Sequence, residues 1–450
     1  MTDRELTTLF ALADVEPEPA LPPGFAEQTV AVARRSVRRR RAVAAFVAAA
    51  AALVAGTVVV AGPVPGGGQH AATTGGPSLP DRFAGYSRRT ATVAKEPPGR
   101  AVATYTYGNH ELFRTLQPLV VGADRDTYRR VDAIEERRTD KGGYPKALLS
   151  PDGTRILVGD ERGDATSLVL VDLTDGRRRD LPVDPPMRVR LFSWSADGRY
   201  VAYGRAPVPG QSDPGRNGTP TTGELVILDL ATGISTRHPQ TTPVRSASFA
   251  PDSRRLAVQL DREAWIVAVD GRRQRQLVLP PGRELLMRYA WLPDGALIAT
   301  VPRTEDPPYQ RWSNELAVVD AAGEGRMVAP PVTVGWMLGW RSPTRLVTFE
   351  MGEDAVGGSI IEVALDTGER RVLSRFSDSS SCEYGTQRCQ VGDLQLATGL
   401  LARLDIRPGI DRGDRPLWQS LAFVGLGFVG LALALAALLA AGARAVRRRR

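Results

Sequence analysis

Two cysteines are the residues of this chain best suited to forming a covalent cross-link. Cys382 and Cys389 are its only cysteines, and they lie close together in the polar stretch SSSCEYGTQRC. Outside the cytoplasm, a pair at this spacing favours a disulfide that closes a small loop. A metal site is the alternative, but two thiolates are half a ligand set and no histidine lies nearby. We therefore predict a disulfide between these two residues.

Residue patterns for catalysis are scarce. His70, His110 and His238 are the only histidines, and they lie in a linker or in polar turn contexts. A Ser-His-Asp triad needs a histidine held by a carboxylate and a serine on a strained turn, yet no Gly-x-Ser-x-Gly occurs. His-Glu-x-x-His, paired CxxC and calcium-loop patterns are also missing. On these grounds we predict that the chain is not an enzyme and needs no cofactor or metal.

Four aspartates recur at a regular spacing and could be mistaken for ligands. The gaps between Asp152, Asp197, Asp252 and Asp294 are 45, 55 and 42 residues. Asp-Gly suits tight turns, because Gly takes positive φ and Asp bonds its own backbone. Since the same residue recurs in each repeat, we interpret it as a turn residue. The turns are Ser150–Gly153, Ser195–Gly198, Ala250–Ser253, Leu292–Gly295 and a degraded Ser342–Thr344.

Strand-like runs surround each turn. An aromatic or apolar run such as LFSW (191–194) leads into the turn, and a run such as RYVAYG (199–204) leaves it. A run ending in an acidic residue and a Gly turn follows, as in ELVILDLATG (224–233), and then a further run, as in ERRVLSRF (369–376). Short β-branched runs between such turns are typical of hairpins. Four strands per repeat of about 40–50 residues is the blade unit of a β-propeller.

These repeats resemble those of the TolB-like, WD-repeat-like propellers of bacteria, whose mark is a strand ending in a Ser-Pro-Asp-Gly turn and followed by another strand. The resemblance covers about 144–376 and implies an all-β propeller that serves as a binding platform. Residues 100–140 are expected to form a divergent first blade, and 391–406 could supply a closing strand. We predict about six blades, with five or seven possible, over residues 81–410.

Two Pro-rich insertions interrupt the repeats between the first two β runs after a turn. They are residues 205–222 and 302–313. Loops on a rigid scaffold often carry binding residues. The second insertion is the better candidate because Tyr309, Arg311 and Trp312 are residue types enriched in binding hot spots.

Two long apolar segments flank the repeats. Residues 42–62 and 418–441 contain no charged residue, and about 20 apolar residues span a bilayer as a helix. Six arginines lie just before the first segment, and five lie within 442–450, after the second. Because positive charge stays on the cytoplasmic side, we predict a two-pass protein of the bacterial cell membrane. The tails 1–41 and 442–450 would be cytoplasmic, and the propeller, reached through a linker at 63–80, extracytoplasmic.

The charge distribution argues against nucleic acid as a partner. The chain carries +8, of which residues 1–41 contribute +1 and 443–450 contribute +5. A nucleic-acid binder should carry its basic patch on the folded domain. Only three of the 58 basic residues are lysine, a bias typical of GC-rich bacterial genomes.

Three functions are compatible with this organisation. We favour a membrane-anchored binding platform for an envelope protein, a peptide or a glycan. The second is a transmembrane sensor, because residues 4–13 place Leu6, Leu9 and Phe10 on one helical face of a tail that weakly resembles the cytoplasmic heads of anti-sigma factors. A cytoplasmic partner would then bind residues 1–33. The third is an unrecognised enzyme that uses carboxylates in the propeller channel.

Overall fold

The computed structural model divides the chain into two compact units, Met1–Gln69 and His70–Arg450, and describes residues of the second. The described residues are 76–83, 90–108, 117–137, 146–159, 166–206, 223–260, 263–286, 288–300, 314–320, 325–328, 331–352, 357–376, 390–409, 430, 434, 437, 438 and 441.

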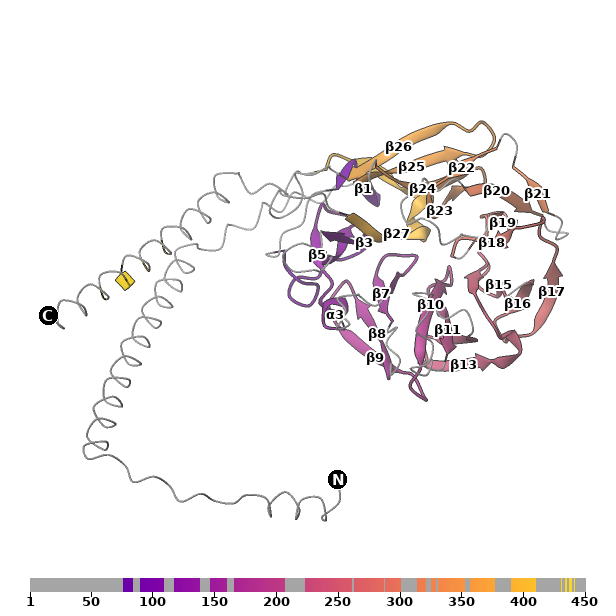
Figure 1. The fold of residues 1–450 in the computed structure, drawn as a ribbon, viewed down its shortest axis with the longest axis horizontal. Helices are drawn as coiled ribbons and strands as arrows, with labels where there is room; N and C mark the ends of the chain where they lie inside the picture. Colours follow the sequence, from indigo (N-terminus) through magenta and orange to yellow (C-terminus); the bar gives the residue numbers. More distant parts are fainter. Residues whose placement is uncertain are drawn as a thin grey trace, which may run out of the picture. The chain divides into compact units, whose positions relative to one another are not determined.

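The described strands form the six blades of a β-propeller, which confirms the predicted fold and blade number. Figure 1 shows the blades in a ring around one axis, with the outermost strands at the periphery. Strands that follow one another within a blade pair antiparallel. The blades are numbered from 1 to 6 along the chain, and their strands are given from the axis outward.

Blades 1 to 3 each contain four strands. Blade 1 is β27 (Gln390–Leu396), β3 (Ala101–Gly108), β4 (Gln117–Gly122) and β5 (Tyr128–Arg130). Blade 2 is β6 (Ala147–Leu149), β7 (Arg155–Val158), β8 (Ser167–Asp172) and β9 (Arg178–Pro182). Blade 3 is β10 (Arg188–Trp194), β11 (Tyr200–Ala206), β12 (Glu224–Asp229) and β13 (Ile234–His238).

Blades 4 to 6 follow the same plan, and the last two gain an extra strand. Blade 4 is β14 (Ser246–Phe249), β15 (Arg255–Gln259), β16 (Ala264–Ala268) and β17 (Arg273–Leu277). Blade 5 is β18 (Glu284–Leu285), β19 (Leu297–Thr300), β20 (Asn314–Val319) and β21 (Gly325–Met327), with β22 (Thr333–Val334) beside β20. Blade 6 is β23 (Trp336–Ser342), β24 (Arg345–Met351), β25 (Gly358–Ala364), β26 (Arg370–Phe376) and β2 (Arg82–Phe83). Short helices are α3 (Asp132–Glu135), η1 (Pro239–Thr241) and η4 (Thr398–Arg403).

The hydrophobic core is divided among the joints between blades. In β8, Leu168 and Leu170 pack with blade 3, whereas Val169 and Val171 belong to the cluster shared with blade 1. Successive side chains of a strand point to opposite faces, so an internal strand with two covered faces is apolar throughout. No blade can bury its faces without both neighbours, and several blades must therefore fold together.

Both ends of the propeller sequence close the ring. The expected closing strand is β27, which completes blade 1 from the C-terminal side by pairing antiparallel to β3. From the N-terminal side, β2 adds to the outer edge of blade 6, parallel to β26, with Phe83 opposite Phe376. The joint between blades 6 and 1 is thus built from segments about 300 residues apart in the sequence.

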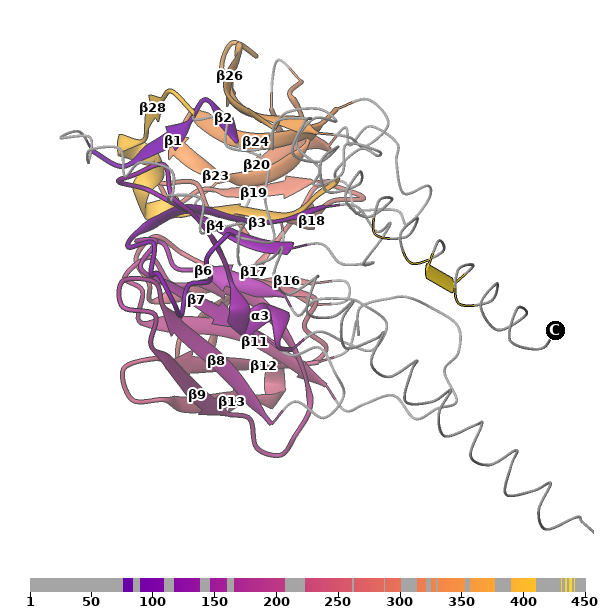
Figure 2. The ribbon, with the colours of Figure 1, turned by 90° about the vertical axis from the view of Figure 1, so that its left-hand side faces the viewer.

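A second parallel pair joins the two ends directly. β1 (Ser78–Pro80) lies beside β28 (Asp405–Arg407), as Figure 2 shows. In their register, Leu79 is opposite Ile406. The N–H of Gly409 donates to Asp81 Oδ1 at 2.8 Å. Residues 78–80 had been assigned to the linker from their composition, and a strand of three residues has no periodicity that would reveal it.

Arg407 fixes this pair to blade 1. Its buried guanidinium donates hydrogen bonds to the carbonyl and hydroxyl of Ser78 and to the carbonyls of Gly122 and Ala123. Asp126, also buried, lies 3.7 Å from it. Burial lowers the pKa of Arg407, and the charge of Asp126 opposes that shift. Buried charges are tolerated when they are paired and hydrogen-bonded in this way.

The predicted membrane spans fall outside this description. Residues 42–62 lie outside the described residues, and so does 418–441 except for five helical positions. No helix among the described residues combines the length and hydropathy needed to cross a membrane.

Candidate functional site

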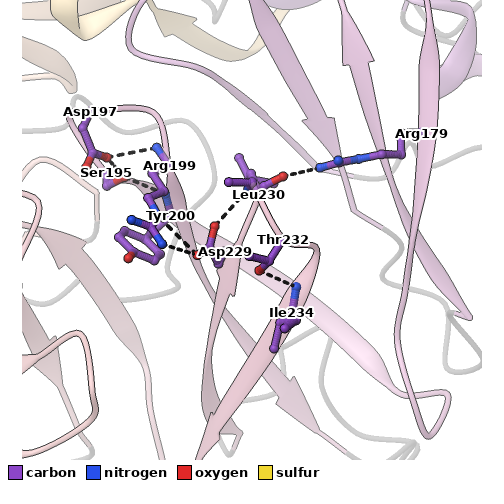
Figure 3. A network of polar contacts seen from close by, with 10 residues as sticks. Arg179, Ser195, Asp197, Arg199, Tyr200, Asp229, Leu230, Thr232 and Ile234 are labelled. Carbon is purple, nitrogen blue, oxygen red and sulfur yellow. Dashed lines mark hydrogen bonds and ion pairs between the residues drawn. The ribbon is translucent and has the colours of Figure 1, made fainter.

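The first turn of blade 3 shows what the repeated aspartate does (Figure 3). Ser195 Oγ donates to Asp197 Oδ1 at 2.6 Å, and that oxygen also accepts from the backbone N–H of Arg199 at 3.0 Å. The N–H of Tyr200 donates to Ser195 Oγ at 2.8 Å. The corresponding serine and aspartate of blade 2 make the same three kinds of contact. These carboxylates are used by the turn itself, as the sequence predicted, and are not a catalytic set.

An ion pair extends this network toward the neighbouring blade. Arg199 contacts Asp229 at 2.7 Å, and its hydrogen bond lowers the pKa of that carboxyl group. Arg179 of blade 2 donates to the carbonyl of Leu230 in blade 3 (Figure 3). Exposed ion pairs of this kind contribute little to stability. The contact from Arg179 to Leu230 links the two blades, and the carboxylates of Asp197 and Asp229 are bonded within blade 3.

His238 is the one histidine within the described residues, and it is buried at the joint between blades 3 and 4. From the sequence, this histidine had been placed only in a polar turn context. Gly271 leaves room for the imidazole, since a Cβ there would lie 1.9 Å from its Nδ1. Burial lowers the pKa of His238, and Asp270 and Glu224 oppose the shift. Its Nε2 has no hydrogen-bond partner in the described part of the chain.

The two rims of the propeller differ in what they present. Turns between first and second strands and between third and fourth strands lie at one end of every blade, here called the turn rim. Connections between second and third strands and between blades lie at the opposite end, the loop rim, because the strands alternate in direction. The inner strand of each blade begins at the loop rim, next to the ring axis. Residues at these six beginnings must therefore lie around one point.

Charged and aromatic side chains lie at or directly before five of those beginnings, and Asp393 lies further along the inner strand of blade 1. We call them the axial group, and each is partly exposed. The exposed fraction is 48% for the Lys146 side chain, 36% for the Arg245 side chain and 40% for Trp336. Solvent and a ligand can thus reach them, unlike the buried turn serines at the other ends of the inner strands. The group consists of Lys146, Arg188, Arg245, Glu284, Trp336 and Asp393.

Two ion pairs link neighbouring blades within the axial group. Lys146 of blade 2 pairs with Asp393 of blade 1, and Arg245 of blade 4 pairs with Glu284 of blade 5 at 3.2 Å. Asp393 has a φ of 49° at a register shift in β27. Asp tolerates this conformation better than most residues, and bulges commonly redirect a side chain. The bulge in β27 therefore lies at the residue that pairs with Lys146 of blade 2.

Arginines from blades 3 and 5 both contact Phe192 of β10. Val189 and Leu191 face blade 2, so the alternating Arg188 and Arg190 face blade 4. The guanidinium of Arg190 lies 5.9 Å from the ring centre of Phe192, a residue of the cluster shared with blade 4.

Arg288 of blade 5 reaches the same place. Its Nε donates to the carbonyl of Phe192 at 3.1 Å, although blade 4 stands between the two blades. Arg245 of blade 4 directly precedes the intervening inner strand. Arg188, Arg190, Arg245 and Arg288 are here called the axial arginines.

Backbone groups on the inner edges of several inner strands are already hydrogen-bonded to side chains. The amide of Gln395 accepts from the N–H of Leu149 at 3.2 Å and donates to the carbonyl of Ala147 at 2.7 Å. Ser193 Oγ accepts from the N–H of Phe249 at 3.2 Å. Gln259 Oε1 accepts from the N–H of Leu285 at 3.1 Å. Edge strands that are capped in this way are poor templates for an added strand.

None of the sequence-predicted site residues falls among the described residues. Tyr309, Arg311 and Trp312 belong to the connection between β19 and β20, whose ends lie at the loop rim. Cys382 and Cys389 belong to the connection from blade 6 to β27. The binding loop and the disulfide therefore remain predictions.

The axial group was missed because its members are scattered over 250 residues. The sequence carries one related feature, a charged residue six to ten positions before the turn aspartate in each of blades 2 to 5, but its spacing varies from blade to blade. No group of three or more His, Cys, Asp or Glu that could hold a metal occurs among the described residues.

No protein-family model matches the chain, and no curated protein matches it. Solved structures that are similar include TolB from Acinetobacter baumannii, with 14% identity over 66% of this chain and 67% of that one, at a TM-score of 0.43. Another is an oligogalacturonate lyase in complex with manganese, with 15% identity over 70% and 89% and a TM-score of 0.41. A third is the tricorn protease, with 12% identity over 65% and 30% and a TM-score of 0.41.

The predicted TolB-like β-propeller is confirmed at the level of the fold, for which the strand pairing is the evidence. The prediction that the chain is not an enzyme was wrong. It rested on missing sequence motifs alone, whereas a lyase and a protease are among the solved structures similar to this chain. A propeller hosts many activities, so missing sequence motifs are no ground for excluding an enzyme.

Proposed function

We propose that this chain is a ligand-binding platform: a propeller held outside the cytoplasmic membrane by two spans, which binds an envelope component at its loop rim. The axial group carries the proposal. It places basic, acidic and aromatic side chains, partly exposed, around one point of a rigid ring. Trp and Arg are enriched where interfaces bind most strongly. At the turn rim, in contrast, the repeated serines and aspartates of blades 2 and 3 bond their own turns.

Photo-crosslinking in intact cells tests the binding part. A photoreactive amino acid at Trp336 of the full chain should give a defined adduct with an envelope component. The matched control is the same substitution at Ile234, an apolar residue of the turn rim that is 64% exposed. Adducts at neither position, or equally at both, would contradict a binding site at the loop rim.

Reporter fusions test the location. The proposal requires a reporter near residue 215 to be accessible from outside the cell and reporters at residues 1 and 450 to be inaccessible. The two uncharged segments and the arginines beside them support this arrangement. A cytoplasmic signal from the fusion near 215 would remove the envelope partner and the reason to expect a disulfide.

A further inference from the structure

We infer that the axial arginines, with Trp336, form a binding site for a carboxylate-bearing glycan. This inference rests on the proposed function and specifies its ligand. The innermost parts of blades 3 to 5 carry the four axial arginines, two of which contact Phe192. Glu284 is the one acidic residue in the described inner strands of these blades. The excess positive charge selects an anionic ligand.

Arg188 is the residue most clearly available to such a ligand. Lys146 and Arg245 each have an acidic partner, and Arg288 is bonded to Phe192. In the described residues Arg188 has no ion pair, and its buried Nε has no hydrogen-bond partner. A buried donor without a partner costs free energy, which a ligand carboxylate could recover. The planar guanidinium suits a carboxylate, because it can form two parallel hydrogen bonds.

The site favours a ligand recognised by side chains over a peptide added as a strand. Strand addition needs free backbone groups along an edge. Next to the axial arginines, the carbonyl of Phe192 and the N–H groups of Phe249 and Leu285 are already bonded to side chains of other strands. A glycan does not require these groups. Its sugar rings can instead lie against Trp336, which opens the inner strand of the blade that follows Arg288.

Calorimetric titration of the full chain in detergent tests this inference. The probes are alginate oligosaccharides, dextran oligosaccharides of matched length, which lack the carboxylates, and poly-L-glutamate, a peptide with the same charged group. Alginate should bind and dextran should not. Arg188→Gln should weaken alginate binding by at least about tenfold, because hydrogen bonds from charged groups typically contribute that much.

Two further variants keep the result interpretable. Arg272→Gln removes the same charge from an exposed side chain of the turn rim and should change alginate binding by less than about twofold. Trp336→Ala should weaken it independently of charge. Absent alginate binding, binding unaffected by Arg188→Gln, or equally tight binding of poly-L-glutamate would overturn the inference. If alginate fails while Trp336 still crosslinks to an envelope component, the platform stands and only the glycan assignment is lost.

Discussion

The joint between blades 3 and 4 and the joint between blades 6 and 1 solve the same packing problem by different means. The first uses residues supplied by the repeat: an apolar layer and serines that bond the next blade, such as Ser193 to the N–H of Phe249 and Ser253 to the N–H of Asp197. The second joins distant segments with a dense aromatic cluster and a buried arginine. Its rings belong to Phe83, Tyr105, Tyr107, Phe349 and Phe376.

The difference shows that the contacts supplied by the repeat join consecutive blades, whereas the joint that closes the ring needs additional contacts. Phe83 and Phe376 stack at 4.3 Å between ring centres, and Tyr105 meets both edge-on. Closing a ring of about 300 residues costs more chain entropy than placing the next blade of a hairpin series. Large aromatic contacts compensate for this cost because they bury much area and gain from edge-to-face geometry. Closure is therefore the joint on which the whole ring depends.

Removing an aromatic side chain from the closure joint should have the largest effect. Phe376→Ala should lower the free energy of unfolding by about 3–5 kcal/mol, since it leaves a cavity where four rings had a partner. Hydrogen exchange measured by mass spectrometry should rise in β1, β27 and β28 before it rises in β14 to β16. Uniform exchange across all blades would show that closure is not a distinct unit.

Arg407→Gln should cost about 1.5–3 kcal/mol, the range typical of hydrogen bonds from a charged group, because buried carbonyls lose their donor. Chemical denaturation followed by tryptophan fluorescence measures it. Arg272→Gln, on an exposed turn, is the control and should lie within about 0.5 kcal/mol of the unmodified chain. Equal effects of the two variants would mean that β28 does not hold the ring closed.

Ser193→Ala should cost about 1 kcal/mol, because it removes a single neutral hydrogen bond from the repeated joint. The same denaturation experiment applies, with Thr236→Ala, which removes an exposed hydroxyl from the outer strand of blade 3, as the control. A loss as large as that of Phe376→Ala would erase the difference between the two kinds of joint.

Acid should weaken the repeated joint through His238. Burial lowers the pKa of this imidazole, so the unfolded chain binds its proton more readily than the folded chain. Its contribution to stability is present above the unfolded pKa of about 6.5 and is lost as the pH falls toward the folded value. His238→Gln should flatten the unfolding free energy between about pH 7 and 5. An unchanged slope in this variant would assign the effect to other groups.

The repeats could be predicted from the sequence because each blade has a recognisable pattern within about 40–50 consecutive residues. Asp-Gly turns and strand-like runs recur in the same order in each repeat, so a blade can be identified by comparison with the repeats next to it in the sequence. The strands β1, β2 and β28 gave no such signal: two or three residues show no period, and their partners lie about 300 residues away. The burial of Arg407 could not be predicted, because the residues around it in the sequence carry no pattern that indicates a buried position.

The candidate site was less accessible to prediction than the fold. Residue type within a single loop was the basis for choosing Tyr309, Arg311 and Trp312, and such a choice needs only a short stretch of sequence. The axial arginines come from three repeats, and only the closed ring brings them together. Their charge is also invisible in the total, because the tails account for most of it.

The parallel pairing of β1 with β28 has a mechanical consequence. If tension from the two proposed anchors reaches the propeller, it pulls the N-terminal end of β1 and the C-terminal end of β28 in opposite directions along neighbouring strands. The load then falls in shear on all their hydrogen bonds at once, together with those of Arg407, instead of opening them one after another. The propeller would thus be a tether that resists stretching until its closure fails as a whole.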